Sequence, residues 1–337
     1  MTIILKTNMP QLNRMLLILF FSIGIRLVNA QSVNMYISTN GKDSNNGLSV
    51  SAPLSTLQEA FLRISLRKEK LPVNILLSGG VYHLKQPVRV LPEYSGTAQA
   101  PVTIRPLGDE QVTFDGSLQI RGWKKYKGTI WYTTIPEVKK GSLRFGQLFI
   151  NGQSRTLARF PNDGFYTVAG FPDGGTEVDF NTGSKRFKFR RGDIDPHWTN
   201  MEDVRVVVYH FWSDAHLQID KVDVNDSIVT FKYPAEKRFT DDFSGDGARY
   251  FVENVFEGLD KPGEWYLNDH TGVLYYIPMM GEDLATSTVV VPVLSGFLSF
   301  DGDAIKSRYV NNIHFSNITF KYANFIYRSE EHTSELQ

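Results

Sequence analysis

The stretch Asn311–Asn324, NNIHFSNITFKYAN, decides the fold class. Ile313 and Phe315 alternate with polar residues, a polar pair follows, and Ile318 and Phe320 resume the alternation. This period-2 pattern predicts two very short strands separated by a bend. Because such strands bury too little surface to be stable alone, the pattern requires similar coils that stack in parallel. The sequence therefore predicts a parallel β-helix.

Two other stretches repeat this pattern far from the first. Residues 101–116, PVTIRPLGDEQVTFDG, place two apolar alternations around a turn and end in Asp-Gly. Residues 289–302, VVVPVLSGFLSFDG, have the same arrangement and the same ending. The chain between them lacks the pattern, so we expect a β-helix into which a separate domain is inserted.

A helix is expected ahead of the first coils. A double capping box begins at Ser55 and Thr56 and predicts a helix that runs to about Lys70. Such a helix would cover the open end of the stack, whose first coil would otherwise expose unpaired backbone groups. The preceding stretch, Asn40–Gly47, lacks the spacing of a calcium-binding loop and is expected to form a tight turn.

Strands of more ordinary length are expected in the inserted part. Each is rich in β-branched and aromatic residues and is bounded by polar loops, which is typical of an antiparallel β domain. They are predicted at residues 147–151, 155–161, 203–212, 227–233 and 272–277.

The composition excludes several classes of protein. The chain has 36 Lys and Arg against 36 Asp and Glu residues, and it contains no cysteine. Nucleic acids and anionic membrane surfaces are therefore not expected as partners. The lack of cysteine excludes disulfides, thiolate metal sites and cysteine nucleophiles. No cofactor and no metal are predicted.

The amino-terminal residues predict a cleaved secretory signal. Lys6 and Arg14 precede the apolar run Met15–Ile25, and the small residue Ala30 follows it. The run is too short to span a bilayer, so we expect cleavage between Ala30 and Gln31 and no insertion of the mature chain into a membrane. The mature protein is expected to be secreted or periplasmic.

One candidate binding face lies in the inserted domain. His210, Trp212, Asp214 and His216 alternate and share a face if the strand continues through them. Trp212 would stack on a sugar ring, and His210 would bind a hydroxyl group. Metal binding by the two histidines and Asp214 is the alternative, and an ordinary surface is a third.

Four other side chains are candidates for substrate binding. Arg155 and Arg159 could bind a sugar carboxylate or hydroxyl groups, or they could pair with carboxylates of the inserted domain. Glu257 and Glu264 lie where the inserted domain ends. Each could supply a catalytic acid, and the alternative is a packed, hydrogen-bonded junction.

Several of these strings resemble glycoside hydrolase family 141, a group of secreted right-handed parallel β-helix proteins with a β insertion domain. The resemblance covers about residues 35–327 and is most specific in Gly263–Tyr276, GEWYLNDHTGVLYY. It implies a carbohydrate-active enzyme that acts on a polysaccharide or oligosaccharide, with fucosidase or xylanase activity known in that family. A likeness of fold does not define the substrate.

The expected domain plan follows from these patterns and from the resemblance. The last residues, RSEEHTSELQ, resemble the translation of a sequencing-library adapter. The plan is a signal peptide at 1–30, an N-terminal cap and the first coils at 31–142, the β insertion domain at 143–288, resumed coils at 289–327 and a non-native tail at 328–337.

Glycoside hydrolysis needs two carboxyl groups, about 5 Å apart for retention or about 6.5–9.5 Å apart for inversion. The coils of this chain offer Asp115, Asp301 and Asp303, all in Asp-Gly turns where Asp commonly serves as a turn residue. The resemblance implies a catalytic pair on coils beyond Tyr327. We therefore expect an inactive amino-terminal portion of a glycoside hydrolase. A non-catalytic carbohydrate-binding or adhesive protein and a polysaccharide lyase remain as alternatives.

Overall fold

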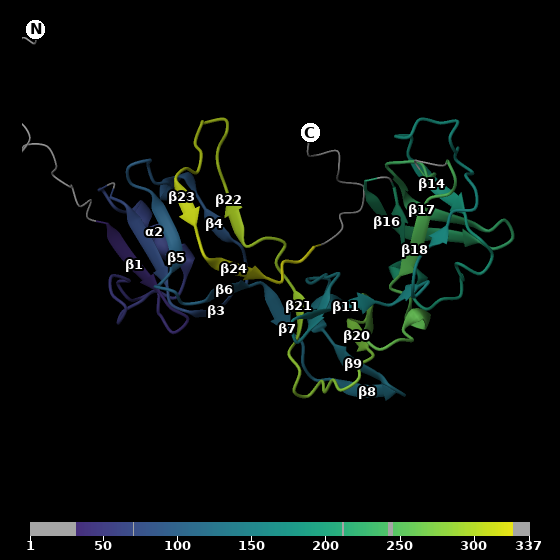
Figure 1. Ribbon diagram of the computed structural model, residues 1–337, viewed down its shortest axis with the longest axis horizontal. Helices are drawn as coiled ribbons and strands as arrows, with labels where there is room; N and C mark the ends of the chain where they lie inside the picture. Colours follow the sequence, from purple (N-terminus) through teal and green to yellow (C-terminus); the bar gives the residue numbers. More distant parts are fainter. Residues whose placement is uncertain (1–31, 70, 211, 242–244, 326–337) are drawn as a thin grey trace, which may run out of the picture. The chain divides into compact units, whose positions relative to one another are not determined.

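The computed structural model describes residues 32–69, 71–210, 212–241 and 245–325 (Figure 1). The expected signal peptide and the adapter-like tail lie outside these residues. Strands dominate the described chain, which confirms the all-β class. The chain divides into two compact units. Unit 1 takes the chain up to Gly80, Val90–Gln111 and Phe300–Ile318, and unit 2 takes Val81–Arg89, Val112–Ser299 and the chain from Thr319.

Unit 1 contains a parallel sheet of short strands. In the sheet they follow the order β1 (Val33–Ile37), β2 (Val73–Leu77), β5 (Val102–Pro106) and β23 (Ile313–Phe315) (Figure 1). Each strand pairs in parallel with the next, without a register shift. The predicted stacking of residues 102–104 with residues 313–315 is therefore confirmed, although most of the chain separates them.

Apolar side chains form columns across this sheet. Met35 pairs with Ile75, Ile75 with Ile104, and Ile104 with Phe315. The first three are 3%, 0% and 0% exposed. Paired residues in neighbouring strands point to the same face, so each strand places an apolar side chain beside that of the strand before it.

A second set of short strands carries an aromatic column in unit 2. Tyr82 lies 5.8 Å from Phe114, and Phe114 lies 5.5 Å from Phe320, measured between ring centroids. Their strands are β3 (Gly80–His83), β6 (Val112–Asp115) and β24 (Ile318–Lys321), and a separate pair is β4 (Val88–Val90) with β22 (Leu298–Phe300).

Helix α2 (Leu57–Ser65) begins where the sequence predicts. The Thr56 hydroxyl accepts a hydrogen bond from the Glu59 N–H at 3.2 Å. The helix ends at Ser65 instead of near Lys70. The Ser65 hydroxyl donates to a carbonyl of the last turn at 2.7 Å, and this bond competes with continuation of the helix.

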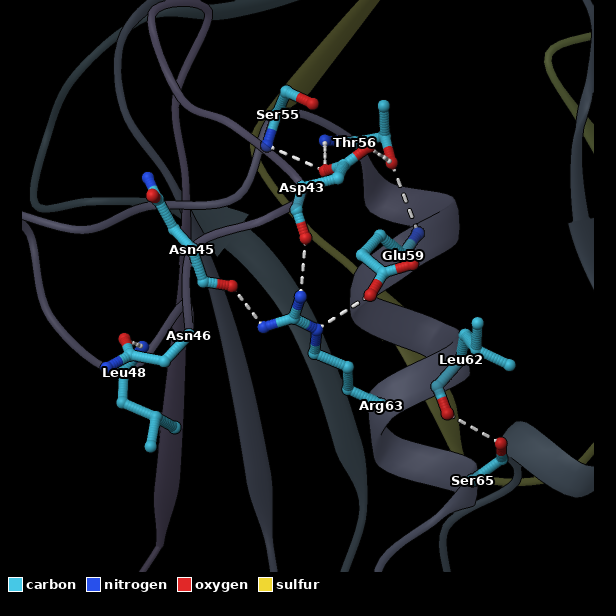
Figure 2. Close-up of polar contacts among 10 residues, drawn as sticks. All are labelled: Asp43, Asn45, Asn46, Leu48, Ser55, Thr56, Glu59, Leu62, Arg63 and Ser65. Carbon is cyan, nitrogen blue, oxygen red and sulfur yellow. Dashed lines mark hydrogen bonds and ion pairs between the residues drawn. The ribbon is translucent and has the colours of Figure 1, made fainter.

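The turn before α2 is fixed by Asp43 and Arg63 (Figure 2). The Asp43 carboxylate accepts hydrogen bonds from the backbone N–H groups of residues 55 and 56 at 2.9 and 3.0 Å. The Arg63 guanidinium donates to the carbonyls of Asp43 and Asn45 and to the Glu59 carboxylate. Because a side-chain cation occupies these oxygens, the segment is the tight turn that we expected and not an open ion site.

The outer edge of β1 is covered by the loop at residues 47–54. Tyr36 donates its N–H to this loop at 2.8 Å and accepts the Leu54 N–H at 2.8 Å. Helix α2 packs nearby through Phe61, whose ring stacks on Tyr94 at 5.2 Å. The loop therefore pairs with the backbone of the edge strand β1, whereas the sequence predicts that the helix alone covers this end of the stack.

Unit 2 contains two larger sheets. In the first, neighbouring strands are antiparallel except for the parallel pair β11 and β19. Its order is β7 (Ser117–Gln119), β21 (Val289–Pro292), β10 (Leu148–Ile150), β11 (Gln153–Leu157), β19 (Glu264–Asn268), β20 (Val273–Tyr276), β9 (Ile130–Thr134) and β8 (Lys124–Lys127).

This sheet corrects one expectation. Val289 and Val291 were predicted to belong to a resumed parallel coil, but β21 runs antiparallel to both β10 and β7. Both valines are at most 1% exposed and belong to the core of this sheet. Period-2 alternation cannot distinguish the two pairings, because both bury every second side chain.

The other sheet is antiparallel throughout the described pairs. The strand expected at 203–212 ends at Tyr209. The order is β12 (Arg159–Phe160), β18 (Arg249–Glu253), β15 (Arg205–Tyr209), β16 (Asp214–Asp223), β17 (Ile228–Ala235) and β14 (Ser184–Lys188), with β13 (Tyr166–Thr167) beside β18.

The remaining helical segments are short. They are α3 (Pro136–Lys139) and the single turns η1 (Pro92–Tyr94), η2 (Met201–Asp203) and η3 (Phe256–Gly258). Among the described helices, none has the length and apolar character needed to cross a membrane.

Candidate functional site

Unit 2 contains a polar pocket with a volume of about 320 Å³. Small-molecule sites typically measure about 300–1,000 Å³. Two apolar side chains, Val138 and Leu143, contribute to its wall. Its polar lining consists of Arg144, Glu202, Asp203, Gln218, Lys232, Asp269 and His270.

The loop between β19 and β20 supplies two of these residues. Asn268 begins the loop, and its side chain accepts the N–H of Thr271 at 2.9 Å. Gly272 ends the loop at φ +69°, where an added Cβ would lie 2.5 Å from the Ile135 carbonyl. The sequence Asn-Asp-His-Thr-Gly therefore forms a tight loop that exposes Asp269 and His270 at its tip.

The turn η2 supplies Glu202 and Asp203. Asn200 precedes it in the left-handed conformation, at φ 52°. Asn254 is 4% exposed and donates to the carbonyls of Asp203 and Leu267 at 3.3 and 3.0 Å. This buried amide thus ties η2 to strand β19, and through it to the loop that carries Asp269.

Two acidic side chains lie close to the ring of His270. Its Nε2 lies 2.8 Å from Glu202 Oε1 and 3.6 Å from Asp203 Oδ1. Asp203 Oδ2 also accepts the backbone N–H of Asp269 at 3.2 Å. The Asp203 side chain is 7% exposed, whereas those of Glu202 and His270 are 61% and 60% exposed. The site thus combines one nearly buried carboxyl group with two exposed partners.

Burial raises the pKa of Asp203, and the negative charge of Asp269 raises it further. Burial also raises the pKa of Asp269, but the positive charges of Arg205 and Arg144 oppose this shift. Residue 269 as a whole remains exposed, so solvent screens its interactions more strongly. Burial thus favours the neutral form of Asp203, while the hydrogen bond from the Asp269 N–H and the charge of His270 lower its pKa in opposition.

This arrangement suits a neutral, hydroxyl-rich ligand. Carboxylate oxygens accept hydrogen bonds from hydroxyl groups, while Arg144, Lys232 and Gln218 donate them. A ligand that carries both hydrogen-bond donors and acceptors can pair with the carboxylates and with these donor side chains. Within the described residues, no group of three or more His, Asp or Glu side chains is arranged to hold a metal ion.

Both predicted arginines contact other residues of the protein. Arg155 donates to the Tyr276 hydroxyl at 2.9 Å and forms an ion pair with Glu282. The Arg159 guanidinium lies 3.8 Å from the centroid of the Phe251 ring and donates to two backbone carbonyls. The carboxylate pairing that we considered is therefore observed for Arg155. Saccharide binding by either arginine stays a prediction.

The four alternating residues do not form one face. The chain reverses after His210, whose N–H donates to the Ser213 carbonyl at 2.8 Å, and Tyr209 pairs with Asp214. The expectation of a continuous strand is therefore wrong, because β15 ends at Tyr209 and the antiparallel strand β16 begins at Asp214. Only Asp214 and His216 remain on one strand, and their side chains lie 3.2 Å apart.

His210 and Trp212 differ sharply in exposure. His210 is 9% exposed and stacks on Phe239 at 6.2 Å. Burial, assisted by the charge of Lys237, lowers its pKa to about 4. Trp212 is 70% exposed, and its ring lies 5.5 Å from that of Phe180. Trp212 is thus the more exposed of the two side chains, and the predicted sugar contact is a proposal for this residue.

Glu257 and Glu264 accept hydrogen bonds from the backbone near the end of the inserted segment. Glu257 accepts from the N–H and the hydroxyl of Thr199 at 3.0 and 2.6 Å. Glu264 is 4% exposed and accepts from the N–H groups of Asp260 and Lys261 at 3.0 and 2.9 Å. These contacts are those of a hydrogen-bonded junction. A part in substrate binding stays a prediction for both residues.

None of the eight predicted residues lines the pocket, and the sequence did not predict Asp203, Asp269 or His270 as a site. A signal was present, because Asp269 and His270 lie inside the stretch most specific to the resemblance, Gly263–Tyr276. No pattern in the sequence connects that stretch with Asp203, since only the packing of η2 against the loop after β19 brings the two segments together.

Comparison with known proteins connects these features to a family. The family model described as the GH141 insertion domain matches residues 128–279. A search of curated proteins found no match. A solved structure described as a glycoside hydrolase is 27% identical, with a TM-score of 0.73, over 87% of this chain and 51% of its own.

Two further solved structures share less. A complex of XylC with xylose is 15% identical, with a TM-score of 0.40, over 84% of this chain and 34% of its own. The pectate lyase Pel9A is 26% identical, with a TM-score of 0.21, over 28% of this chain and 22% of its own. The chain thus spans about half the length of the glycoside hydrolase that it matches (51%). It is a protein similar to glycoside hydrolase family 141, and its residues 128–279 match the GH141 insertion domain.

Proposed function

We propose that this chain is part of a secreted glycoside hydrolase that acts on plant or other complex polysaccharide. We also propose that the pocket of unit 2 binds a saccharide unit of that polysaccharide. The observation that carries the proposal is the pocket itself. It joins Asp203 to the Asp269-His270 loop within the matched insertion domain. Secretion is supported by the apolar run at residues 15–25.

The proposal includes a right-handed parallel β-helix for the coils outside the insertion. In the chain, a strand of the parallel sheet is followed by a strand of the aromatic column three times, as β2–β3, β5–β6 and β23–β24. The order of strands is the same in both sheets. A coil that repeats in this way builds a solenoid. The expected limits of 31–142, 143–288 and 289–327 change in this proposal, because β7 to β9 and β21 pair within the first large sheet of unit 2. The proposed coils comprise β1 to β6 and β22 to β24.

Saccharide binding follows from the chemistry of the pocket wall. A pyranose presents hydroxyl groups that act both as donors and as acceptors, and the wall offers partners of both kinds. The nearly buried Asp203 is fixed by Asp269 and His270, so it is oriented before a ligand arrives. Such preorganisation reduces the entropy lost on binding.

Hydrolysis is expected to require more than these 337 residues. Asp115 accepts from the N–H and the hydroxyl of Ser117, and Asp303 accepts from the Lys306 N–H and pairs with its side chain. Both carboxylates thus serve turns, as expected from the sequence. The use of these two carboxylates in turns also favours the second candidate function, that of a non-catalytic carbohydrate-binding protein. Release of reducing sugar by the 337-residue chain would contradict the predicted inactivity.

Calorimetric titration of the whole chain with xylo-oligosaccharides and fucosylated oligosaccharides tests the pocket. Asp269→Asn should weaken the binding of the preferred saccharide about tenfold, because loss of a hydrogen bond to a charged group costs about 1.5 kcal/mol. The control is Asp220→Asn, an exposed position on β16 that does not line the pocket. Unchanged affinity in Asp269→Asn, or the lack of any saccharide binding, would overturn the assignment.

A further inference from the structure

A row of tyrosines crosses one face of the first sheet of unit 2. In the register of the strands, Lys124 pairs with Tyr132, Tyr132 with Tyr275, and Tyr275 with Tyr266. Directly paired residues point to the same face, so these four side chains form one line across β8, β9, β20 and β19. None of them lines the polar pocket.

The row runs from the interior to the surface. Tyr266 is 1% exposed, and Tyr132 and Tyr275 are partly exposed. Tyr126, on the edge strand β8, is 51% exposed. Its ring centroid lies 5.2 Å from that of Tyr275 and 6.2 Å from that of Tyr132. The row of aromatic rings thus begins in the core at Tyr266 and ends at the exposed ring of Tyr126.

Tyr126 is held in one orientation despite its exposure. Its ring is inclined by 77°, 78° and 79° to the rings of Tyr275, Tyr132 and Phe256, which is the favourable edge-to-face arrangement. A fixed ring loses little entropy when a ligand stacks on it.

The hairpin that carries Tyr126 is basic, although the whole chain has no net charge. Lys124, Lys125 and Lys127 are all exposed, and Arg121 precedes them. No Asp or Glu occurs between Asp115 and Glu137. Lysines on an edge strand also prevent pairing with other chains, but that role does not require an exposed, fixed tyrosine between them.

We propose that Tyr126, Tyr132 and the lysines of β8 form a second saccharide site, separate from the pocket, that binds an anionic polysaccharide. The tyrosine rings stack on the apolar faces of the sugar rings, and the ammonium groups pair with carboxylates of uronic acid residues. The inference rests on the proposed function only in taking a carbohydrate as the partner. Its occupant, a uronic-acid-containing chain, differs from the neutral saccharide expected in the pocket.

Affinity electrophoresis of the full chain in gels that contain polygalacturonate tests this site. Tyr126→Ala should weaken retention about tenfold, whereas Tyr126→Phe, which keeps the ring, should retain most of the affinity. Tyr233→Ala is the matched control, because Tyr233 is 39% exposed and lies on β17, a strand of the other large sheet of unit 2. Equal retention of Tyr126→Ala and the unmodified chain would overturn the proposal.

Charge is tested with a second pair of variants. Lys124→Glu should weaken the binding of polygalacturonate but not of neutral xylan, and Lys221→Glu, an exposed lysine on β16, should change neither. Equal binding of the two polysaccharides by the unmodified chain would overturn the anionic specificity. If the chain bound a single-stranded oligonucleotide as tightly as polygalacturonate, charge alone would explain the binding. That result would also overturn the specificity for an anionic polysaccharide. Titration of the pocket with neutral oligosaccharides in the same proteins separates failure of this site from failure of the pocket.

Discussion

Glu253 shows how much a single side chain on β18 stabilises the second sheet of unit 2. Its Oε1 accepts a hydrogen bond from Arg205 Nε at 3.0 Å and lies 3.4 Å from His216 Nδ1. The Glu253 and His216 side chains are 12% and 7% exposed. Three strands, β15, β16 and β18, thus contribute one ionisable side chain each to this cluster. Removing the charge of Glu253 takes away the negative group that Arg205 and His216 contact.

Glu253→Gln is therefore expected to lower the free energy of unfolding by about 3 kcal/mol at neutral pH. Urea denaturation followed by circular dichroism measures this loss. Glu236→Gln, at an exposed position in the same unit, is the control and should change the free energy by less than about 0.5 kcal/mol. A loss in Glu253→Gln no larger than in the control would show that the cluster adds no stability.

The same side chain determines a pH dependence. Burial alone would raise the pKa of Glu253, but the hydrogen bond from His216 and the charge of Arg205 outweigh it and hold the pKa below the ordinary value of 4.5. A depressed carboxyl pKa adds stability above the unfolded pKa, and that stability is lost as the pH falls through the folded value. The unmodified chain should therefore lose more stability than Glu253→Gln when the pH falls below 4.5.

At the scale of elements, helix α2 depends on its amino-terminal contacts. The Thr56 hydroxyl accepts the Glu59 N–H and donates to Asp43 Oδ2 at 2.9 Å (Figure 2). The cap and the turn before it therefore share one hydrogen-bonded network. The helix has 9 residues, too few to be stable alone in water, so it depends on this cap and on packing.

Thr56→Ala should lower the free energy of unfolding by about 1 kcal/mol, as expected for loss of an N-cap. Asp43→Ala should cost a similar amount or more, because two backbone N–H groups lose their acceptor. The double variant should lose less than the sum, by about 0.5 kcal/mol or more, since the two side chains contact each other. Full additivity in a urea-denaturation cycle would contradict the shared network.

The start of α2 was predictable from the sequence, while its end and the site were not. Capping depends on residues three positions apart, and Thr56 with Glu59 gave that signal. The turn after His210 has no comparable signal, since Gly and Pro are absent from the stretch HFWSD. Asp203 and Asp269 meet only through the packing of η2 against the loop after β19. Such contacts between distant segments are not encoded in any short pattern.

At the scale of the whole molecule, the parallel sheet of unit 1 determines how the chain is organised. Strand β23 returns to β5 after the whole insertion and continues the same register. Alternation predicted the strands, and the need for stacking predicted that residues 102–104 and 313–315 meet. The residue at which the chain returns to the short parallel strands was not predictable from the sequence. Val289 and Leu298 begin similar apolar runs, but the strand at Val289 belongs to the first large sheet of unit 2, whereas the strand at Leu298 does not.

This parallel return of the chain underlies the proposed β-helix, and a disulfide cross-link tests it most directly. The chain has no cysteine, so a pair introduced by Thr103→Cys and His314→Cys is unambiguous. These positions are direct partners in β5 and β23. Neighbouring strands lie about 4.8 Å apart, within disulfide range, whereas the control pair Asn74→Cys and His314→Cys is separated by two such spacings.

The measurement is the yield of the intramolecular cross-link after mild oxidation, read as a mobility shift on non-reducing gels and confirmed by peptide mass. The account predicts a high yield for the Thr103 and His314 pair and little for the Asn74 and His314 pair. Equal yields from the two pairs, or no cross-link between positions 103 and 314, would contradict the parallel return of the chain.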